Sequence, residues 1–315
     1  MSILECELPG APAPAELVVA NVDVCICTFR RASLGDTVRS VAAQALPAGA
    51  RLGIIVVDND VEPEAQARVR ALETELGISV RYVHAPARNI SIARNAALDA
   101  ATAEWIAFID DDETALPGWL AALMRTAKDG GWDAVLGPVD AVYPENAPAW
   151  LKRLDLHSAR PVTSAGRIEK GYAGNVLLRR ASIEARKLRF DLARGRTGGE
   201  DDDFFYRLTD AGGRIGYAAE ARVLEPVASA RTELGWLVRR NFRAGQSHGS
   251  RLRARYAAAG RLAQLGLAAA KASACAAAAC IGAPVAARRN RWLVRMSLHA
   301  GVVARLAGRS EIELY

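Results

Sequence analysis

Short apolar runs with β character alternate with segments of helical period along the first third of the chain. The segments 34–46 and 91–102 repeat their apolar residues with the period of a helix. The apolar runs contain β-branched and aromatic residues and are short enough for strands; they cover residues 22–29, 52–60, 79–85 and 104–110. This alternation predicts an α/β fold with a largely parallel sheet.

Ligands of such folds bind at the carboxyl ends of the strands. Because parallel strands present these ends at one edge of the sheet, polar residues that follow different strands come together there. We therefore expect one crevice to be lined by three clusters: Thr28, Phe29 and Arg30; Asp58, Asn59 and Asp60; and Asp110, Asp111 and Asp112.

The fourth predicted strand runs directly into four adjacent acids, Asp110 to Asp112 followed by Glu113. Such acids repel one another, so they occur either in a fully solvated turn or beside a cation that neutralises them. The sequence contains neither a G-x-G-x-x-G motif after the first strand nor a G-x-x-x-x-G-K-[ST] motif, and a phosphate would need another cradle. A carboxylate-bound divalent cation provides one, because it bridges protein oxygens and a diphosphate.

A second acidic cluster, Glu200 to Asp203, begins an amphipathic segment in the stretch "RTGGEDDDFFYRL". The helix dipole favours carboxylates at this position. For Asp202 and Asp203 singly, capping and solvation of the helix is a sufficient explanation. The glycines at 198 and 199 give the backbone freedom to enter a crowded site, which favours a chemical role for Glu200 and Asp201. One acidic cluster for a metal and another for a base would form an active site.

Composition adds limits on fold and location. A chain of 315 residues with 51% hydrophobic content has enough apolar residues for a large core. Its five cysteines include no C-x-x-C pair, which argues against a disulfide framework or a zinc site and fits a reducing, cytoplasmic compartment. Residues 1–20 contain acids and prolines where a secretory signal needs basic and apolar residues, so export is not expected.

The basic charge is concentrated in residues 251–315, where eleven Lys or Arg oppose two acids, a net charge of +9. The other residues hold 30 basic and 33 acidic side chains, a net charge of −3. An alanine-rich basic tail suits an anionic membrane surface, whereas no nucleic-acid-binding module is indicated. We expect an interfacial helical hairpin rather than a spanning helix, with a helix pair packed on the catalytic domain as the alternative.

The motifs taken in order resemble those of the inverting family-two glycosyltransferases. They are "VDVCICTFRR", "VVDND", "NISIARNAALDAA", "FIDDDE", "GYAGN" and "GGEDDDF". Within this family, "VLGPV", "FRAGQSHG", "AARRNRW" and "EIELY" make the chain most similar to succinoglycan-type exopolysaccharide β-1,4-glucosyltransferases. The resemblance implies a GT-A fold, a Rossmann-like mixed sheet flanked by helices with a C-terminal helical extension. It divides the chain into an N-terminal tail, a catalytic domain and a membrane-associating tail, at residues 1–20, 21–250 and 251–315.

The resemblance also implies roles for individual residues. Asp201 matches the general base, Asp112 the direct ligand of Mg²⁺ or Mn²⁺, and Asp58 the carboxylate that hydrogen-bonds uracil. The other residues expected around the nucleotide sugar are Thr28, Arg30, Asn59, Arg94, Asp110 and Asp111. Contacts with the acceptor or with phosphate are expected from Gly174, Asn175, Glu200, Arg240, Arg243 and His248.

The implied activity is metal-dependent transfer of a sugar, with UDP-glucose as the expected donor, onto a lipid-linked oligosaccharide. It would take place at the cytoplasmic face of the bacterial inner membrane. The chain has "RRNFRAGQSH" where processive members carry Q-x-x-R-W, which indicates addition of a single sugar. Two alternatives are a sugar nucleotidyltransferase and a non-catalytic sugar-nucleotide-binding or membrane-scaffold protein. The first would need a glycine-rich basic loop that residues 28–36 do not provide, and the second would need no base.

Overall fold

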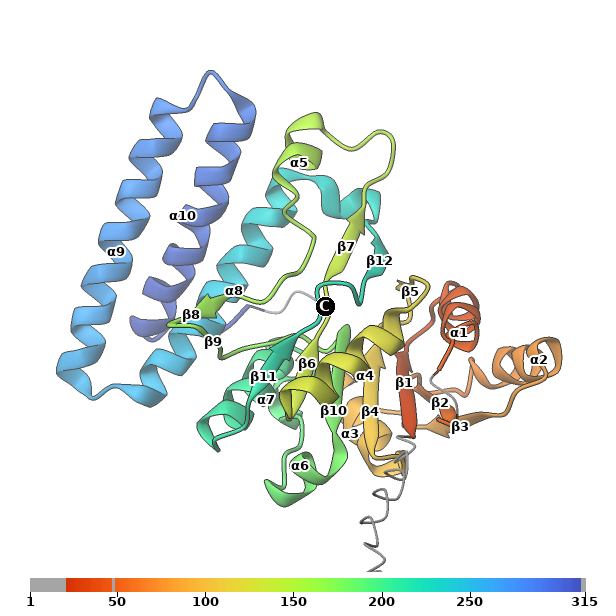
Figure 1. Ribbon diagram of the computed structural model, residues 1–315. Coiled ribbons are helices and arrows are strands. Elements are labelled where there is room, and N and C mark those ends of the chain that lie inside the picture. The colour runs from red at the N-terminus through yellow and green to blue at the C-terminus, as the bar shows by residue number, and fades with distance from the viewer. Residues whose placement is uncertain (1–20, 47–48, 313–315) are drawn as a thin grey trace, which may run out of the picture.

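A seven-stranded mixed sheet forms the centre of the computed structural model, which describes residues 21–46 and 49–312 (Figure 1). The predicted tail at 1–20 lies outside the described residues. The strand order is β11-β6-β10-β4-β1-β2-β3. Only β10 is antiparallel to its neighbours in this sheet. The strands are β1 (Val22–Thr28), β2 (Leu52–Asp58), β3 (Val80–His84), β4 (Trp105–Ile109), β6 (Ala134–Leu136), β10 (Asn175–Arg179) and β11 (Ile215–Tyr217).

The four predicted strands are confirmed as β1 to β4. Their register places Thr28 of β1 beside Asp58 of β2, so these two strands end level with each other. The antiparallel strand β10 begins at Asn175, opposite Ile109 at the end of β4. The polar residues after β1, β2 and β4 and the loop before β10 therefore share one edge of the sheet.

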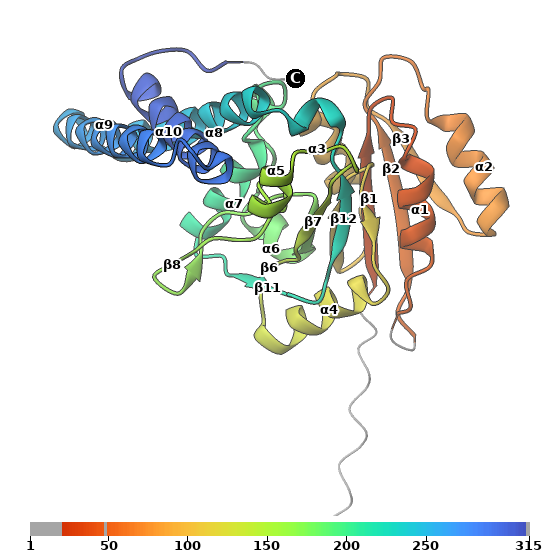
Figure 2. The same cartoon turned by 90° about the horizontal axis from the view of Figure 1, so that it is seen from above.

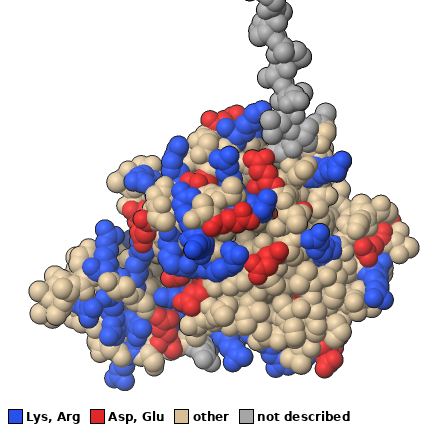
Figure 3. Space-filling model, turned by 90° about the horizontal axis from the view of Figure 1, so that it is seen from below, with Lys and Arg blue, Asp and Glu red and all other residues tan. Residues whose placement is uncertain are grey.

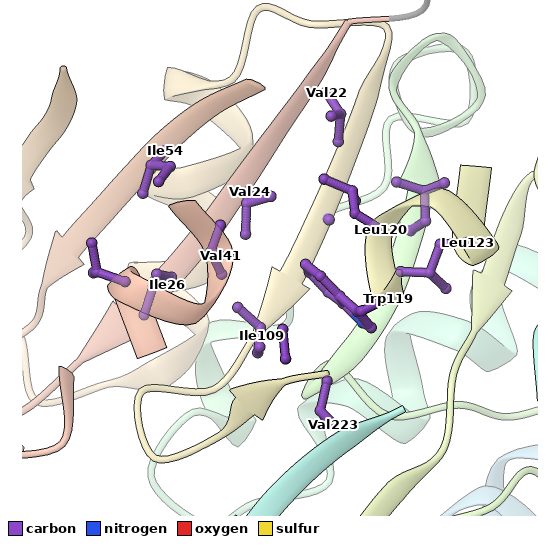
Figure 4. Packing of buried hydrophobic residues seen from close by; sticks show 14 of the residues in the cluster. Val22, Val24, Ile26, Val41, Ile54, Ile109, Trp119, Leu120, Leu123 and Val223 are labelled. Atoms are coloured by element: carbon purple, nitrogen blue, oxygen red, sulfur yellow. The ribbon is translucent and has the colours of Figure 1, made fainter. Parts of the chain in front are cut away.

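Helices cover both faces of the sheet (Figure 2). One face packs against α1 (Leu34–Ala42), α2 (Gln66–Leu76) and α4 (Trp119–Gly130). Figure 4 shows this layer, with Trp119 and Leu123 of α4 facing the strands. The other face packs against α3 (Ile90–Ala100), α6 (Arg180–Ala185) and α7 (Glu200–Asp210). Because the central strands are buried on both sides, they are largely apolar rather than alternating, with Asp23 of β1 as an exception.

A smaller sheet lies beyond β4 and β6 and carries part of the site. It consists of β5 (Thr114–Ala115), β12 (Val223–Pro226) and β7 (Val139–Val142), in the order β5-β12-β7. The remaining short elements are the hairpin β8 (Thr163–Ser164) and β9 (Arg167–Ile168), helix α5 (Ala149–Leu154), and the 3₁₀ turns η1 (Leu192–Arg194) and η2 (Ser229–Thr232).

Three long helices end the described chain: α8 (Leu234–Arg255), α9 (Ala258–Ile281) and α10 (Ala286–Leu306). Glycines let α10 approach α8 closely, since a Cβ at Gly245 would lie 1.9 Å from the carbonyl oxygen of Leu298. Helix α9 packs on α10 and is otherwise mostly exposed. The expected tail is thus a helical hairpin whose second helix packs on α8. Helix α8 runs across the predicted boundary between residues 250 and 251.

Candidate functional site

The ends of β1 and β4 are joined by hydrogen bonds to Asp111. The Thr28 hydroxyl donates to the Asp111 carboxylate over 2.7 Å, and the Ser33 hydroxyl donates to the Asp111 carbonyl over 2.9 Å. The amide of Asn59 donates to the Thr28 carbonyl over 2.9 Å, which ties the end of β2 to the same place. These bonds confirm the predicted convergence of the three polar clusters. They also give Thr28 a role in holding the acidic turn, residues Asp110 to Glu113.

The four acids after β4 divide into two that are buried and two that are partly exposed at the strand edge where the crevice is predicted. Asp111 and Glu113 are buried, and the Glu113 carboxylate accepts the backbone N–H of Asp110 over 2.9 Å, which closes the turn. Asp110 and Asp112 are partly exposed. The Arg31 guanidinium lies 3.3 Å from the Asp112 carboxylate. The acidic turn is therefore a braced structure that presents two carboxylates to the crevice.

Burial, together with repulsion by neighbouring acids, raises the pKa of Asp111 and of Glu225. Burial raises the pKa of Asp111 to about 7, the Thr28 hydrogen bond opposes this, and the charges of Asp112 and Asp110 add to it. Burial also raises the pKa of Glu225, on β12, to about 7, and the same two aspartates raise it further. The strand edge thus gathers several carboxyl groups whose charged forms are disfavoured and would be stabilised by a cation.

The second acidic cluster reaches this crevice from the N-terminus of α7. The Arg94 guanidinium is buried, lies 2.5 Å from the Glu200 carboxylate and 3.7 Å from that of Asp110. Asp201 follows Glu200 and is partly exposed, and its charge helps to raise the pKa of Asp110, after desolvation, which is the largest cause. Arg94 is therefore the link that holds the two clusters side by side.

Glycines permit the close approach of backbone to these carboxylates. A Cβ at Gly174 would lie 2.7 Å from a carboxylate oxygen of Glu113 and 2.9 Å from one of Asp110. Gly199, directly before Glu200, has a φ of +83° and serves as the N-cap of α7. Gly174, predicted as an acceptor contact, is thus required beside the acidic turn for reasons of space.

The polar side-chain atoms of three predicted contact residues form hydrogen bonds within the protein. The Asp58 side chain is 1% exposed, and its carboxylate accepts from the amides of Asp60 and Ala65 and from the Tyr82 hydroxyl. The Asn59 amide group bonds to the backbone of Ala85 and Asn89. The Asn175 side chain is fully buried and bonds to Trp119, Pro138 and Ala221. The structure gives these residues bracing roles within the protein, and their contacts with a base or an acceptor stay predictions.

The remaining predicted residues differ in their surroundings. Arg30 is half exposed beyond the end of β1 and forms an ion pair with Asp60. Arg240, on α8, contacts His157 and lies close enough to Glu225 to oppose the rise in its pKa. Desolvation and the neighbouring Lys170 and Arg251 lower the pKa of His248, which lies farther along α8. Glu200 and Arg243 are buried in ion pairs, which favours positioning roles over direct contact with a substrate.

Sequence reasoning missed two charged residues at the crevice, Arg31 and Glu225. Arg31 follows β1 directly in "TFRR", so its place after a strand end was a usable signal. Glu225 is an acid inside the apolar stretch "RVLEPV". Its approach to Asp112 depends on the pairing of β12 with β5 and β7, which the sequence alone does not reveal.

The donor set fits Mg²⁺ or Mn²⁺ as a partial set of ligands. Carboxylate oxygens are the ligands these hard cations prefer, and Asp110 and Asp112 present them at the open side of the turn. Within residues 21–46 and 49–312 no group of three or more His, Cys, Asp or Glu side chains forms a cage for a metal ion. A cation here would therefore take its other ligands from a bound diphosphate and from water.

Comparison with known proteins identifies the family. The family model described as "Glycosyl transferase family 2" matches residues 23–186, and this segment carries β1 to β4 and the acidic turn. The chain belongs to glycosyl transferase family 2. The fold is of the GT-A type with added C-terminal helices, as the sequence motifs predicted.

Related proteins cover most of the chain. It is 47% identical over 295 residues to the "Succinoglycan biosynthesis protein ExoM" of Rhizobium meliloti (strain 1021), covering 94% of this chain and 96% of that protein. It is 29% identical over 248 residues to the "Glucosyl-dolichyl phosphate glucuronosyltransferase" of Haloferax volcanii, covering 72% and 76% of the two chains. Among solved structures, S. aureus TarS 1-349 in complex with UDP-GlcNAc has a TM-score of 0.52 at 19% identity, covering 66% of this chain and 59% of that one.

Proposed function

We propose that this family-two glycosyltransferase is an inverting, metal-dependent enzyme that moves glucose from UDP-glucose onto a lipid-linked oligosaccharide during exopolysaccharide assembly. The observation that carries the proposal is the meeting of two acidic clusters at one crevice. Arg94 contacts both of them, at Glu200 and at Asp110. One cluster is suited to a diphosphate with its cation and the other supplies a base.

The chemistry assigns separate tasks to the two clusters. Asp110 and Asp112 would hold the cation, whose chemistry would be to stabilise the negative charge that develops on the departing diphosphate. Asp201 removes the proton of the acceptor hydroxyl as its oxygen attacks the anomeric carbon. The bond from this carbon to the phosphate oxygen breaks, and in-line attack inverts its configuration. Arg31 and Arg94 hold the carboxylates of the acidic turn while the charge is redistributed.

The relatives support the choice of donor and acceptor by what their names state. The R. meliloti protein is named for succinoglycan biosynthesis. The H. volcanii protein is named for transfer to a sugar on a lipid phosphate, and a TarS structure contains UDP-GlcNAc. Together they support a uridine diphosphate sugar as donor and a lipid-linked glycan as acceptor.

A donor screen tests the proposal. With Mn²⁺, the full chain is expected to release UDP from UDP-glucose faster than it releases UDP from UDP-GlcNAc or UDP-glucuronic acid. It should also release UDP from UDP-glucose faster than it releases GDP from GDP-mannose. EDTA should abolish this release. A lipid-linked oligosaccharide acceptor should accelerate it. Release of pyrophosphate from UTP with a sugar 1-phosphate would instead support a nucleotidyltransferase, and binding of UDP-sugars without turnover a scaffold.

We also propose that α9 places the enzyme on an anionic membrane surface, at the cytoplasmic face of the inner membrane. Helix α9 is long and apolar enough to cross a membrane by length and composition, and only 17% of its apolar window is buried in the protein. Figure 3 shows Lys and Arg side chains gathered on the side where α9 and α10 lie. Lys271 interrupts the apolar stretch, which favours an interfacial position over a spanning one.

Replacing two exposed apolar side chains of α9 tests this membrane contact. Leu262 and Ile281 are 70% and 84% exposed. We expect Leu262→Gln/Ile281→Gln to weaken binding to vesicles that contain phosphatidylglycerol by about 10-fold or more, because both side chains lose apolar burial. Flotation at low salt measures this, and added salt should weaken binding of the unaltered protein.

The matched control changes two apolar side chains of similar exposure elsewhere. Val162 and Leu192 are 64% and 54% exposed on the catalytic domain. Val162→Gln/Leu192→Gln should float as the unaltered protein does. Equal flotation of both double variants would contradict the role of α9. Truncation after residue 250 is a poor substitute, since it removes α10 from the surface of α8.

A further inference from the structure

Arg243 of α8 forms hydrogen bonds to the loop 197–199, which leads to the candidate base Asp201. Its guanidinium donates to the carbonyl of Thr197 over 2.9 Å and to that of Gly198 over 2.8 Å. It also donates to the Ser247 hydroxyl over 2.6 Å. The two carbonyls directly precede Gly199, Glu200 and Asp201. Arg243 thus reaches from one helix to the backbone that begins another.

Glu311 forms an ion pair with the same guanidinium group. Its carboxylate lies 2.7 Å from the Arg243 guanidinium, and the two side chains are only 16% and 5% exposed. Ser250 and Arg305 also contact the Glu311 carboxylate. A buried guanidinium needs such a partner, because an uncompensated buried charge is strongly destabilising.

The backbone around Glu311 is fixed independently of this ion pair. The buried Gln246 side chain donates to the carbonyl of Ser310 and accepts from the amide of Ile312, each over 2.9 Å. The segment after α10 returns along α8 in this way (Figure 2). The Gln246 side chain therefore holds the backbone of residues 310–312 against α8, which fixes the position of Glu311.

The backbone of the loop before α7 has conformational freedom, which hydrogen bonds from α8 would restrict. Gly198 and Gly199 both have a φ of +83°, a region that glycine enters easily and leaves easily. Ser247 packs against Gly199, since a Cβ there would lie 2.8 Å from its hydroxyl oxygen. The position of Asp201, two residues beyond Gly199, follows from how this glycine pair is held.

We propose that Arg243 and Glu311 form a clamp that positions the catalytic base. This inference rests on the proposed function, in which Asp201 removes the acceptor proton. Arg243 and Glu311 are positioning residues that act through the loop 197–199. The motifs "FRAGQSHG" and "EIELY", whose roles the sequence left open, contribute the two sides of the clamp through Arg243, Gln246 and Glu311.

The test compares Glu311→Ala with Glu311→Gln and with the control Asp210→Ala. Asp210 also forms an ion pair with α8, at 3.3 Å from Arg251, but at the far end of α7. We expect Glu311→Ala to lower kcat by about 10-fold to 100-fold, because a small displacement of a reacting group is enough for such a loss. The KM for donor and the Kd for UDP with Mn²⁺ should change by less than about twofold. The reason is that the acidic turn, where the donor is expected to bind, follows β4 and is not part of the loop 197–199.

The conservative variants add a second criterion. Glu311→Gln keeps an oxygen acceptor for Arg243 and should retain most of kcat. Arg243→Lys can no longer reach both carbonyls and Glu311 together, so it should lower kcat, and combining it with Glu311→Ala should add little. An unchanged kcat in Glu311→Ala, or a fall in kcat matched by equal loss of UDP affinity, would overturn the clamp.

Hydrogen exchange of the unliganded protein keeps the clamp testable if the proposed function fails. Amides of residues 197–203 should exchange faster in Glu311→Ala than in Asp210→Ala, while those of β1 and β4 should be unchanged. If the unaltered chain transfers no sugar but this exchange rises, the proposed function fails and the clamp stands as a structural device. Unchanged exchange at 197–203 removes the clamp whatever the activity.

Discussion

Asp201→Asn should reduce sugar transfer by about 10²-fold to 10⁴-fold, the range expected when a general base is lost. Asparagine has nearly the same shape but takes no proton from the acceptor hydroxyl. The change leaves Arg94 with its contacts to Glu200 and Asp110, so the crevice should keep its form. UDP affinity in the presence of Mn²⁺ should therefore change by less than about twofold, which marks a loss confined to the transition state.

A transfer assay beside isothermal titration with UDP and Mn²⁺ measures both quantities. Asp210→Asn, the same substitution at the far end of α7, is the matched control and should transfer sugar at the unaltered rate. Near-normal transfer by Asp201→Asn would assign the base elsewhere, with Glu200 or Asp203 as the next candidates. The buried ion pair of Glu200 with Arg94 already makes it the weaker of the two.

The sequence predicted the sheet well because burial on both faces leaves a plain signal. Strands β2 and β4 are apolar runs that stop at polar residues, β1 is one that is interrupted by Asp23, and the register aligns these stops at one edge. Local composition was sufficient to place Asp111 near Thr28, although 83 positions separate them. The order of polar strand ends therefore carried most of the information about the site.

The sequence did not reveal which polar atoms at that edge are free. Asp58 ends β2 and Asp110 follows β4, yet the Asp58 carboxylate bonds to the backbone of its own loop and to Tyr82, whereas Asp110 is partly exposed. The difference depends on the path of the loop after each strand. Glu225 was missed for a related reason, because β12 reaches the acidic turn only through pairing with β5 and β7.

For the basic tail, composition predicted the helices but not the surface against which each of them lies. Its helical hairpin was predicted, but its alanine content did not separate a helix on a membrane from one on a protein. In the structure, α10 packs on α8 through Gly245 and Gly301, and α9 remains mostly exposed. Helix α8 connects these helices to the loop before Asp201 through Arg243. Membrane contact and catalysis would therefore be joined by a single helix.

Asp112→Asn should affect binding where Asp201→Asn affects only turnover. Asp112 is a partly exposed carboxylate beside Arg31, and its charge raises the pKa of Glu225, after burial, the largest cause. Removing one negative oxygen from a partial set of ligands should lower UDP affinity in Mn²⁺ by about 100-fold or more, since even changes to groups behind metal ligands cost 10-fold to 100-fold. In EDTA, where no cation joins protein and diphosphate, UDP affinity should be nearly the same in both proteins.

The decisive quantity is therefore the difference between UDP affinity in Mn²⁺ and in EDTA, measured by titration for each protein. The control Asp36→Asn removes a carboxylate that is 79% exposed on α1 and should leave this difference intact. A general loss of net negative charge would affect both variants equally, whereas loss of a ligand affects only Asp112→Asn. If Asp112→Asn keeps the full metal dependence of UDP binding, Asp112 is a solvated residue of the turn, and the cation site proposed here does not include it.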